Sequence, residues 1–253
     1  MRGILLVDKP LGFSSAGAVA RLRRHLGKAV RMGHCGTLDP LATGLLVLLL
    51  GPTTKRSASI TQDDKTYEAT VRFGFSTEGD DREGLPVHWG HFFQLARESI
   101  VKVLTTFVGD LLQRPPVFSA KKICGVPSYR LARRGIAAPG EPRPITIHSI
   151  GDVRWAAPLL SFSVHCSKGT YVRSLARDLG KALGCPAHLH ALRRTRSGPF
   201  LLSVAHRLCD LKSLAPEKLA QLAEETEAQF FPSSAHDPVA GRPPRFPVYS
   251  GAE

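Results

Sequence analysis

The sequence has few cysteines and no pattern that would make them metal ligands or disulfides. The five cysteines are odd in number and far apart, with no C-x-x-C pair and no Cys/His grouping at the spacing of a zinc site. They are Cys35, Cys124, Cys166, Cys185 and Cys209. We therefore expect buried free thiols in a reducing compartment and no zinc site built from cysteines.

Long hydrophobic runs are also missing. The longest, Leu45–Leu50, is six residues, whereas a helix needs about 20 apolar residues to cross a bilayer. Near the N-terminus, Ile4–Val7 is an apolar run of four residues before Asp8, too short for the core of a signal peptide. The sequence therefore predicts a cytoplasmic protein that does not enter a membrane.

Acidic residues are scarce relative to basic ones. The chain has 34 Lys and Arg against 21 Asp and Glu, a net charge of +13. Residues 213–253 hold three basic and six acidic side chains, so the first 212 residues carry a net charge of +16. A segment with this much positive charge suits a polyanionic partner, with nucleic acid as the first candidate. Charge alone would also allow a merely soluble surface or affinity for anionic membranes.

The hydrophobic pattern predicts both helices and strands. With 253 residues, the chain can form one large domain with an appendage. Helices and strands alternate without regular βαβ spacing, which favours an α+β fold with a mixed sheet. The expected strands are 4–7, 45–50, 66–73 and 162–166, and the expected helices are 15–26, 169–183 and 217–230.

Two loops stand out between these elements. Residues 33–44 contain three glycines and a proline around a single carboxylate, Asp39. Glycines at this density indicate a backbone shaped closely around something. An ordinary Asx turn before Pro40 is the alternative, and the residues alone leave both open. Residues 79–84 are mostly acidic, and we expect them to be an exposed connection.

Five segments, taken together and in order, resemble TruB-type pseudouridine synthases. They are Val7-Asp8-Lys9-Pro10, residues 33–46, Lys65-Thr66-Tyr67, residues 166–173 and Leu192-Arg193-Arg194. Linked motifs are more specific than any one pattern, and these cover roughly residues 3–210. The resemblance implies a catalytic domain over residues 1–212 with a mixed, mainly antiparallel central sheet. It also implies isomerisation of uridine to pseudouridine at position 55, in the T loop of tRNA.

The resemblance assigns catalytic roles to three residues. Asp39 matches the essential aspartate, which acts at C1′ of the ribose either by attack or by assisting loss of the base through a glycal. Arg173 matches the arginine that pairs with this carboxylate and would favour its ionised form. Tyr67 matches a tyrosine beside the target base, although a core tyrosine with a polar partner is the alternative. None of these roles needs a metal or a redox cofactor, so the resemblance implies that the protein uses no metal ion and no other cofactor.

The resemblance also assigns substrate-binding residues. Tyr171 and Leu192 match positions that line the substrate pocket, although a leucine there could equally belong to the core. His34 matches a histidine that holds the rearranged T loop after the target uridine has been flipped out, a step that chemistry on a stacked base requires. Lys9 and Lys168 are expected to contact either phosphate or the scaffold.

The C-terminal part is expected to differ from that of many family members. Residues 213–253 predict a helix followed by a flexible tail rich in Pro, Gly and Ser, without the RNA-binding PUA module that the family often carries. The predicted partner is the T arm of tRNA, bound by a monomer without guide RNA. A non-catalytic tRNA-folding factor and a guide-dependent synthase are the alternatives. The intact catalytic set argues against the first, and the missing module against the second.

Overall fold

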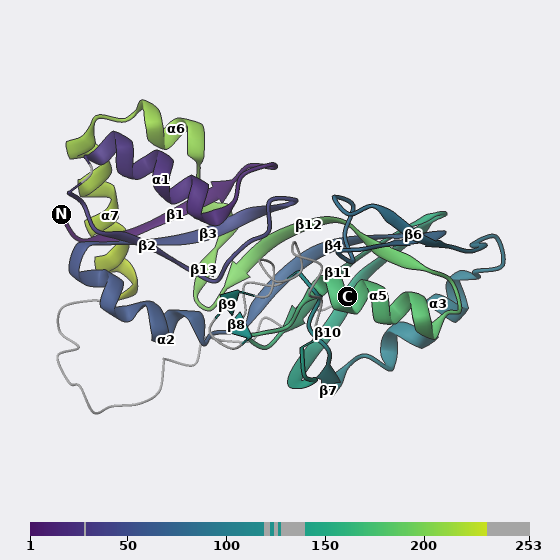
Figure 1. The fold of residues 1–253 in the computed structure, drawn as a ribbon. Helices are drawn as coiled ribbons and strands as arrows, with labels where there is room; N and C mark the ends of the chain where they lie inside the picture. The colour runs from purple at the N-terminus through teal and green to yellow at the C-terminus, as the bar shows by residue number, and fades with distance from the viewer. Residues whose placement is uncertain (28, 119–121, 124–125, 128–139, 232–253) are drawn as a thin grey trace.

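A ten-stranded mixed sheet runs through the molecule (Figure 1). The computed structural model describes residues 1–27, 29–118, 122–123, 126–127 and 140–231. The central strands, in sheet order, are β14 (His206–Arg207), β1 (Gly3–Lys9), β3 (Ala42–Leu50), β12 (Ala187–Ser197), β4 (Lys65–Phe73), β11 (Leu159–Cys166), β10 (Arg143–Ala156) and β7 (Gly109–Gln113). Beside this path, β2 (Met32–Cys35) pairs with β3 and β13 (Phe200–Leu201) with β12. The pairs β1–β14 and β3–β12 are parallel and the others antiparallel, which confirms the predicted α+β fold with a mixed sheet.

Helices gather at both ends of this sheet (Figure 1). At one end, beside β1 and β3, lie α1 (Ser15–Leu26), α2 (Ser57–Thr61), α6 (Leu208–Ser213) and α7 (Pro216–Phe230); at the other lie α3 (Arg97–Thr105) and α5 (Val172–Ala182). The remaining elements are the 3-10 turns Gly51–Arg56 and Leu202–Val204 and two short ribbons, β5 (Phe75–Thr77) with β6 (Pro86–Trp89) and β8 (Lys122–Ile123) with β9 (Val126–Pro127). Across the residues that the structure describes, the helices are all too short or too polar to pass through a bilayer.

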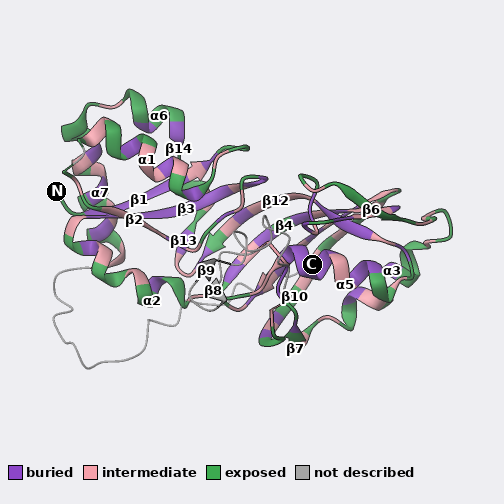
Figure 2. Ribbon diagram, viewed as in Figure 1, coloured by how far each residue is buried: buried purple, intermediate pink, exposed green. Residues whose placement is uncertain are grey.

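The buried residues follow the strands of the main sheet (Figure 2). Residues 45–50 of β3 are buried on both faces, which explains why this strand is a continuous apolar run. In β4 only alternate residues are buried, from Tyr67 to Phe73, as its period of two predicts. The strand pattern therefore places Tyr67 on the core face of β4, and Thr66 on the opposite face.

The two terminal parts of the described chain pack on each other. In α7, Leu219 and Ala223 are fully buried in the main core. A Cβ on Gly3 of β1 would lie 2.3 Å from the Ala223 carbonyl oxygen, so this strand and helix touch where only glycine fits. The helix predicted at 217–230 is confirmed, and it is anchored to the body. The predicted flexible tail, residues 232–253, lies outside the described residues.

Two predicted boundaries and one prediction of solvent exposure were wrong. The loop predicted at 33–44 is shorter, because residues 32–35 form β2 and residues 42–44 begin β3. Helix α5 begins at Val172 and not near Gly169, a glycine that has a φ of 81°. The acidic segment 79–84 is only partly exposed: Asp81 is 8 % exposed, because α5 supplies cationic partners for its carboxylates.

Candidate active site

The loop that carries Asp39 is pinned on both sides of that residue. Leu38 and Leu41 are buried in the main core. The Ser15 hydroxyl, at the start of α1, accepts a hydrogen bond from the Leu38 N–H (2.8 Å) and donates one to the Leu38 carbonyl (3.0 Å). The Gly12 N–H donates to the Pro40 carbonyl at 2.9 Å. Because its neighbours are fixed, Asp39 projects from a rigid loop, with its side chain 36 % exposed.

Arg173, in the first turn of α5, faces Asp39. Its Nε lies 2.9 Å from the Asp39 Oδ2, and the contact is an ion pair without the alignment of a hydrogen bond. The rest of the guanidinium is held by the scaffold: Nη1 donates to the Gly79 carbonyl at 3.2 Å, and Nη2 to the Phe118 carbonyl at 2.9 Å. The Arg173 side chain is 7 % exposed. A buried, fixed cation therefore sets the orientation of a carboxylate that solvent can still reach.

Tyr67 and Arg194 line the same hollow from the sheet. Tyr67, on β4, is almost fully buried, and this burial raises the pKa of its phenol, although the charge of the neighbouring Arg194 and a hydrogen bond with it act in the opposite direction. Arg194, on β12, donates to the Leu45 carbonyl (2.7 Å) and to the Gly36 carbonyl (2.9 Å). The phenol therefore stays neutral at physiological pH.

Gly44, on β3, allows a close approach to β12, the strand that carries Arg194. Gly44 has a φ of 93°, which side-chain-bearing residues rarely adopt. A Cβ there would lie 2.4 Å from the Arg194 carbonyl oxygen. Glycine thus allows β3 and β12 to run side by side at the point where Arg194 turns towards the Asp39 loop.

The Asp39 pocket, as we call this hollow, is completed by the segment that leads into α5. Tyr171 precedes the helix, and Gln113 holds its backbone twice: the Tyr171 N–H donates to Oε1 at 2.8 Å, and Nε2 donates to the Tyr171 carbonyl at 3.1 Å. The residues lining the pocket are Gly36, Thr37, Leu38, Asp39, Thr61, Lys65, Tyr67, Ser167, Gly169, Thr170, Tyr171, Val172, Arg173, Leu192 and Arg194. Polar and apolar walls together suit a nucleotide better than a purely apolar ligand.

Lys9 does not line the Asp39 pocket, and it is buried within the protein. Its ammonium donates to the carbonyls of Pro10 (3.0 Å) and Phe13 (2.6 Å), and the residue is fully buried. Burial lowers the pKa of Lys9 to about 8, while the charges of Asp39 and Glu83 act in the opposite direction. Two roles were expected for Lys9. These contacts favour the one in which it supports the scaffold, here the segment from Pro10 to Phe13, over a contact with phosphate.

The titration of Lys9 gives a test of its burial. Its pKa is about 8 in the folded protein, against 10.5 for a lysine that is not buried, so the unfolded chain binds more protons between these pH values. The free energy of unfolding should then rise with pH across this window. We expect urea denaturation at pH 8, 9 and 10 to show a steeper rise for the native protein than for Lys9→Met. If the free energy of unfolding rises equally with pH in both proteins, burial does not lower the pKa of the Lys9 amine.

Two family models match the chain, one after the other. The N-terminal domain of TruB family pseudouridylate synthases matches residues 23–172, and the C-terminal domain of tRNA pseudouridylate synthase B matches residues 173–229. The chain belongs to the TruB family. It is therefore a pseudouridine synthase, as the five motifs predicted.

Relatives in the TruB family agree with this assignment over most of the chain. The chain is 49 % identical to tRNA pseudouridine synthase B of Dechloromonas aromatica over 212 residues, which cover 84 % of this chain and 70 % of the relative. It is 44 % identical to the Bordetella pertussis protein of the same name over 235 residues, covering 92 % and 96 %.

Solved structures add more distant members of this fold. A chain in the crystal structure of a Cbf5-Nop10-Gar1 complex matches with a TM-score of 0.67 and 29 % identity, over 88 % of this chain and 57 % of that one. A chain from an H/ACA RNP bound to a substrate RNA containing 2′-deoxyuridine matches with a TM-score of 0.64 and 26 % identity, over 88 % and 56 %. Our chain thus spans somewhat more than half the length of each.

Most residues singled out by the TruB resemblance meet in the Asp39 pocket. Asp39, Tyr67, Tyr171, Arg173 and Leu192 all line it, although they come from four separate segments of the chain. Their roles in the reaction remain predictions, which the geometry makes testable.

His34 and Lys168 lie elsewhere. His34 is on β2 and does not line the pocket. Burial lowers the pKa of its imidazole, with a further contribution from Arg194. Lys168 contacts the Gln62 side chain, and both line a separate hollow that shares Thr61, Gly169 and Tyr171 with the Asp39 pocket. Neither position conflicts with a contact to RNA outside the pocket.

Arg194, Lys65 and Gln113 are site residues whose function the sequence did not reveal. Arg194 and Lys65 stood in two of the matching motifs, yet only their burial, 1 % and 6 % exposed, shows that their charges serve the interior. The Lys65 ammonium donates to the Thr61 and Asp63 carbonyls. A charged residue on the core face of a strand is the signal that could have found Arg194 and Lys65, whereas nothing near Gln113 in the sequence marks its role.

Proposed function

We propose that this TruB family chain converts the uridine at position 55, in the T loop of tRNA, to pseudouridine, with Asp39 as the group that acts at C1′ of the ribose. The observation that carries this proposal is the partly exposed Asp39 carboxylate, 2.9 Å from a buried arginine at the wall of a mixed polar and apolar pocket. Relatives named tRNA pseudouridine synthase B support tRNA as the substrate.

The proposed reaction moves one bond from nitrogen to carbon within the same nucleotide. The N1–C1′ bond breaks, with Asp39 either attacking C1′ or assisting loss of the base through a glycal. The freed uracil turns within the pocket, and C5 forms the new bond to C1′. A proton leaves C5 and N1 gains one, so atoms and electrons balance without an oxidant or reductant.

The target nucleotide must leave its stack for this to occur. Chemistry on a base requires the base to be turned out of its stacked position into a pocket. Single-stranded loops offer such bases at a lower cost than duplexes do. We propose that the T arm alone supplies the contacts, that the protein acts as a monomer without guide RNA, and that it works in the cytoplasm. Of the cysteines that the structure describes, Cys35, Cys166 and Cys185 are buried as predicted, whereas Cys209 is exposed.

The proposal is tested by mapping pseudouridine at single-nucleotide resolution. Purified protein is incubated with an unmodified tRNA transcript, and in parallel with the isolated T-arm stem–loop, without any other RNA or protein. We expect one pseudouridine, at position 55, in both substrates. Modification only after a guide RNA has been added would favour the guide-dependent alternative. Tight binding without product would favour a tRNA-folding factor.

Tyr67→Phe tests whether the buried phenol takes part. The substitution keeps the ring in the core and removes only the hydroxyl, so the fold should survive. If the phenol assists proton transfer to or from the base, the rate constant of the chemical step should fall by about 10²-fold or more. The measurement is single-turnover pseudouridine formation with enzyme in excess over tRNA. An unchanged rate would leave Tyr67 as a packing residue.

A further inference from the structure

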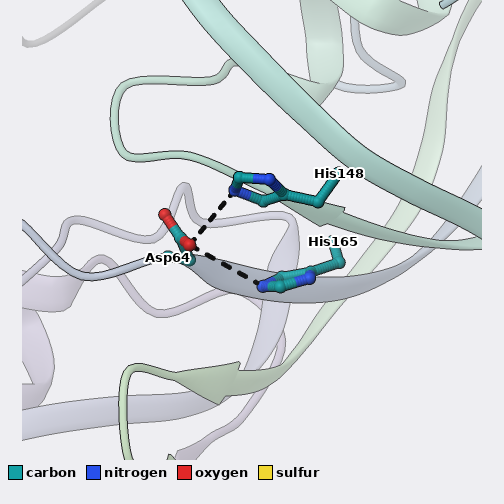
Figure 3. A group of neighbouring side chains, drawn as sticks. All are labelled: Asp64, His148 and His165. Carbon is teal, nitrogen blue, oxygen red and sulfur yellow. Dashed lines mark ion pairs between the residues drawn. The ribbon is translucent and has the colours of Figure 1, made fainter. Parts of the chain in front are cut away.

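Three side chains that can bind metal meet on the surface of the sheet (Figure 3). Asp64 immediately precedes β4, His148 is on β10, and His165 is on β11. The His148 Nε2 lies 3.1 Å from the Asp64 Oδ2, and the His165 Nε2 lies 4.0 Å from the same oxygen. Both imidazole rings turn towards the carboxylate (Figure 3). We call this group the Asp64 triad.

The sheet itself brings the two histidines together. His165 is paired with Thr66 of β4, and alternation puts this row on the face opposite Tyr67. On β10 the register shifts between Ile147 and Ser149, so His148 is the extra residue of a β-bulge. A bulge redirects a side chain relative to regular pairing. Here it leaves the ring centroids of the two histidines 4.7 Å apart.

We propose that the Asp64 triad binds a divalent transition-metal ion, with zinc as the best fit. Two imidazoles and one carboxylate are the ligand types that zinc takes, whereas calcium and magnesium take oxygen ligands. With zinc–ligand distances of about 2.0–2.2 Å, tetrahedral ligand atoms lie roughly 3.4 Å apart. One ligand atom from each residue lies within 4.8 Å of the others. These side chains are half-exposed, so they can rotate and bring the ligand atoms from up to 4.8 Å to the shorter separation that a bound zinc ion requires.

The surroundings of His165 favour its neutral form. Only a neutral imidazole can be a ligand, and burial lowers the pKa of His165, as do His148 and Arg196, against the charge of Asp64. The positive charge of Arg196, on β12, acts against a protonated imidazole and against a bound cation alike, so the carboxylate of Asp64 must outweigh it.

The ion would join three segments behind the Asp39 pocket without entering the reaction. Asp64 is followed by Lys65, and His165 lies two residues before Ser167; both Lys65 and Ser167 line the pocket. Ser167 is bonded to β10 as well, since its N–H donates to the Thr146 carbonyl at 2.8 Å and its hydroxyl accepts the Thr146 N–H at 2.8 Å. A metal bridge here would stiffen one wall of the pocket, so its expected effect is on stability.

The test uses full-length, tag-free protein that has been stripped of metal with a chelator. Zinc chloride is titrated in competition with a chromophoric chelator, and the melting temperature is followed with and without zinc. We expect one zinc ion per chain and a higher melting temperature with zinc. His148→Gln and His165→Gln should each weaken binding by at least about 10-fold, the lower bound known for the loss of residues that merely support ligands, and should remove the rise in melting temperature.

Two controls separate the triad from other ligands on the surface. His91→Gln removes an exposed histidine outside the group, and Cys209→Ser removes the exposed thiol; both variants should bind zinc as the native chain does. Cobalt(II) bound in place of zinc should give visible absorption that His165→Gln abolishes. The proposal is overturned if the native chain takes up no stoichiometric zinc, or if both triad variants bind it as tightly as the native chain. Neither result bears on pseudouridine formation.

Discussion

Asp39→Asn is expected to abolish pseudouridine formation while leaving the affinity for tRNA nearly unchanged. Asparagine has almost the shape of aspartate, and the loop around it is fixed by buried neighbours and the Ser15 hydroxyl. What is lost is the negative charge that we propose acts at C1′. Removing a nucleophile costs several orders of magnitude in other enzymes, so we expect a loss of at least about 10³-fold in the single-turnover rate constant.

The surface pair Arg207–Asp210 provides a matched control for this experiment. Its Nε–Oδ2 distance is also 2.9 Å, but both side chains are more than half exposed. Asp210→Asn should therefore leave the rate unchanged. Filter binding at the same ionic strength measures the affinity for tRNA, because phosphate contacts make the affinity depend on salt. Product formation by Asp39→Asn within about 10-fold of the native rate would rule out Asp39 as the acting group.

Arg173→Lys is expected to lower the rate constant of the chemical step by about 10²-fold, with a small effect on the Michaelis constant. The guanidinium contacts Asp39, Asp81 and two carbonyls at once. A lysine ammonium is a single point charge and cannot keep all four contacts. The positioning of Asp39 would then be lost, and misplacement by about 1 Å costs catalysis of this order.

Arg173→Met measures how much the ion pair with Asp39 contributes to the stability of the fold, apart from its role in positioning Asp39. Breaking a buried ion pair costs about 3–5 kcal/mol, and because Asp39 is one-third exposed, solvent should reduce this to about 2–3 kcal/mol. Urea denaturation measures the loss, with Arg207→Met as the control, which breaks an exposed ion pair and should therefore cost much less stability. If Arg173→Lys keeps its rate within about twofold of the native value, Arg173 does not position the carboxylate.

The elements with strong local signals could be predicted from the sequence. The helix predicted at residues 15–26 is confirmed, and its first turn is capped locally, since the Ser14 hydroxyl accepts the Gly17 N–H at 3.0 Å. The alternating pattern of residues 66–73 and the apolar run of residues 45–50 gave strands that the structure confirms. In each case the signal lies within one turn or one strand, so no distant residue is needed to interpret it.

The parts that depend on distant partners could not be predicted. The acidic segment 79–84 looked like a solvent-exposed loop, but the Arg177 Nη1 lies 2.9 Å from the Asp80 Oδ2. Nothing in the segment itself reveals that partner. The same holds for Gln113, which holds Tyr171 from 58 residues away, and for the Asp64 triad, whose members are separated by at least 17 positions.

The candidate site was predicted through its motifs, and only in part through physics. The residues around Asp39 alone left an Asx turn as an equal alternative. The resemblance named Asp39 and Arg173 as partners, and the structure places them 2.9 Å apart. The resemblance did not show how Arg194 and Ser15 shape the loop, because both act through backbone carbonyls and hydroxyl contacts that leave no pattern in a single sequence.

The position of the bound nucleotide tests the central claim most directly. The measurement is a crystal structure of Asp39→Asn in complex with an unmodified T-arm stem–loop. We expect the target uridine to be out of its stack and within the Asp39 pocket, with C1′ about 3–3.5 Å from the side chain of residue 39, as a reactive geometry requires. A uridine that stays stacked in the loop, or that enters the protein with its ribose out of reach of residue 39, would contradict the account.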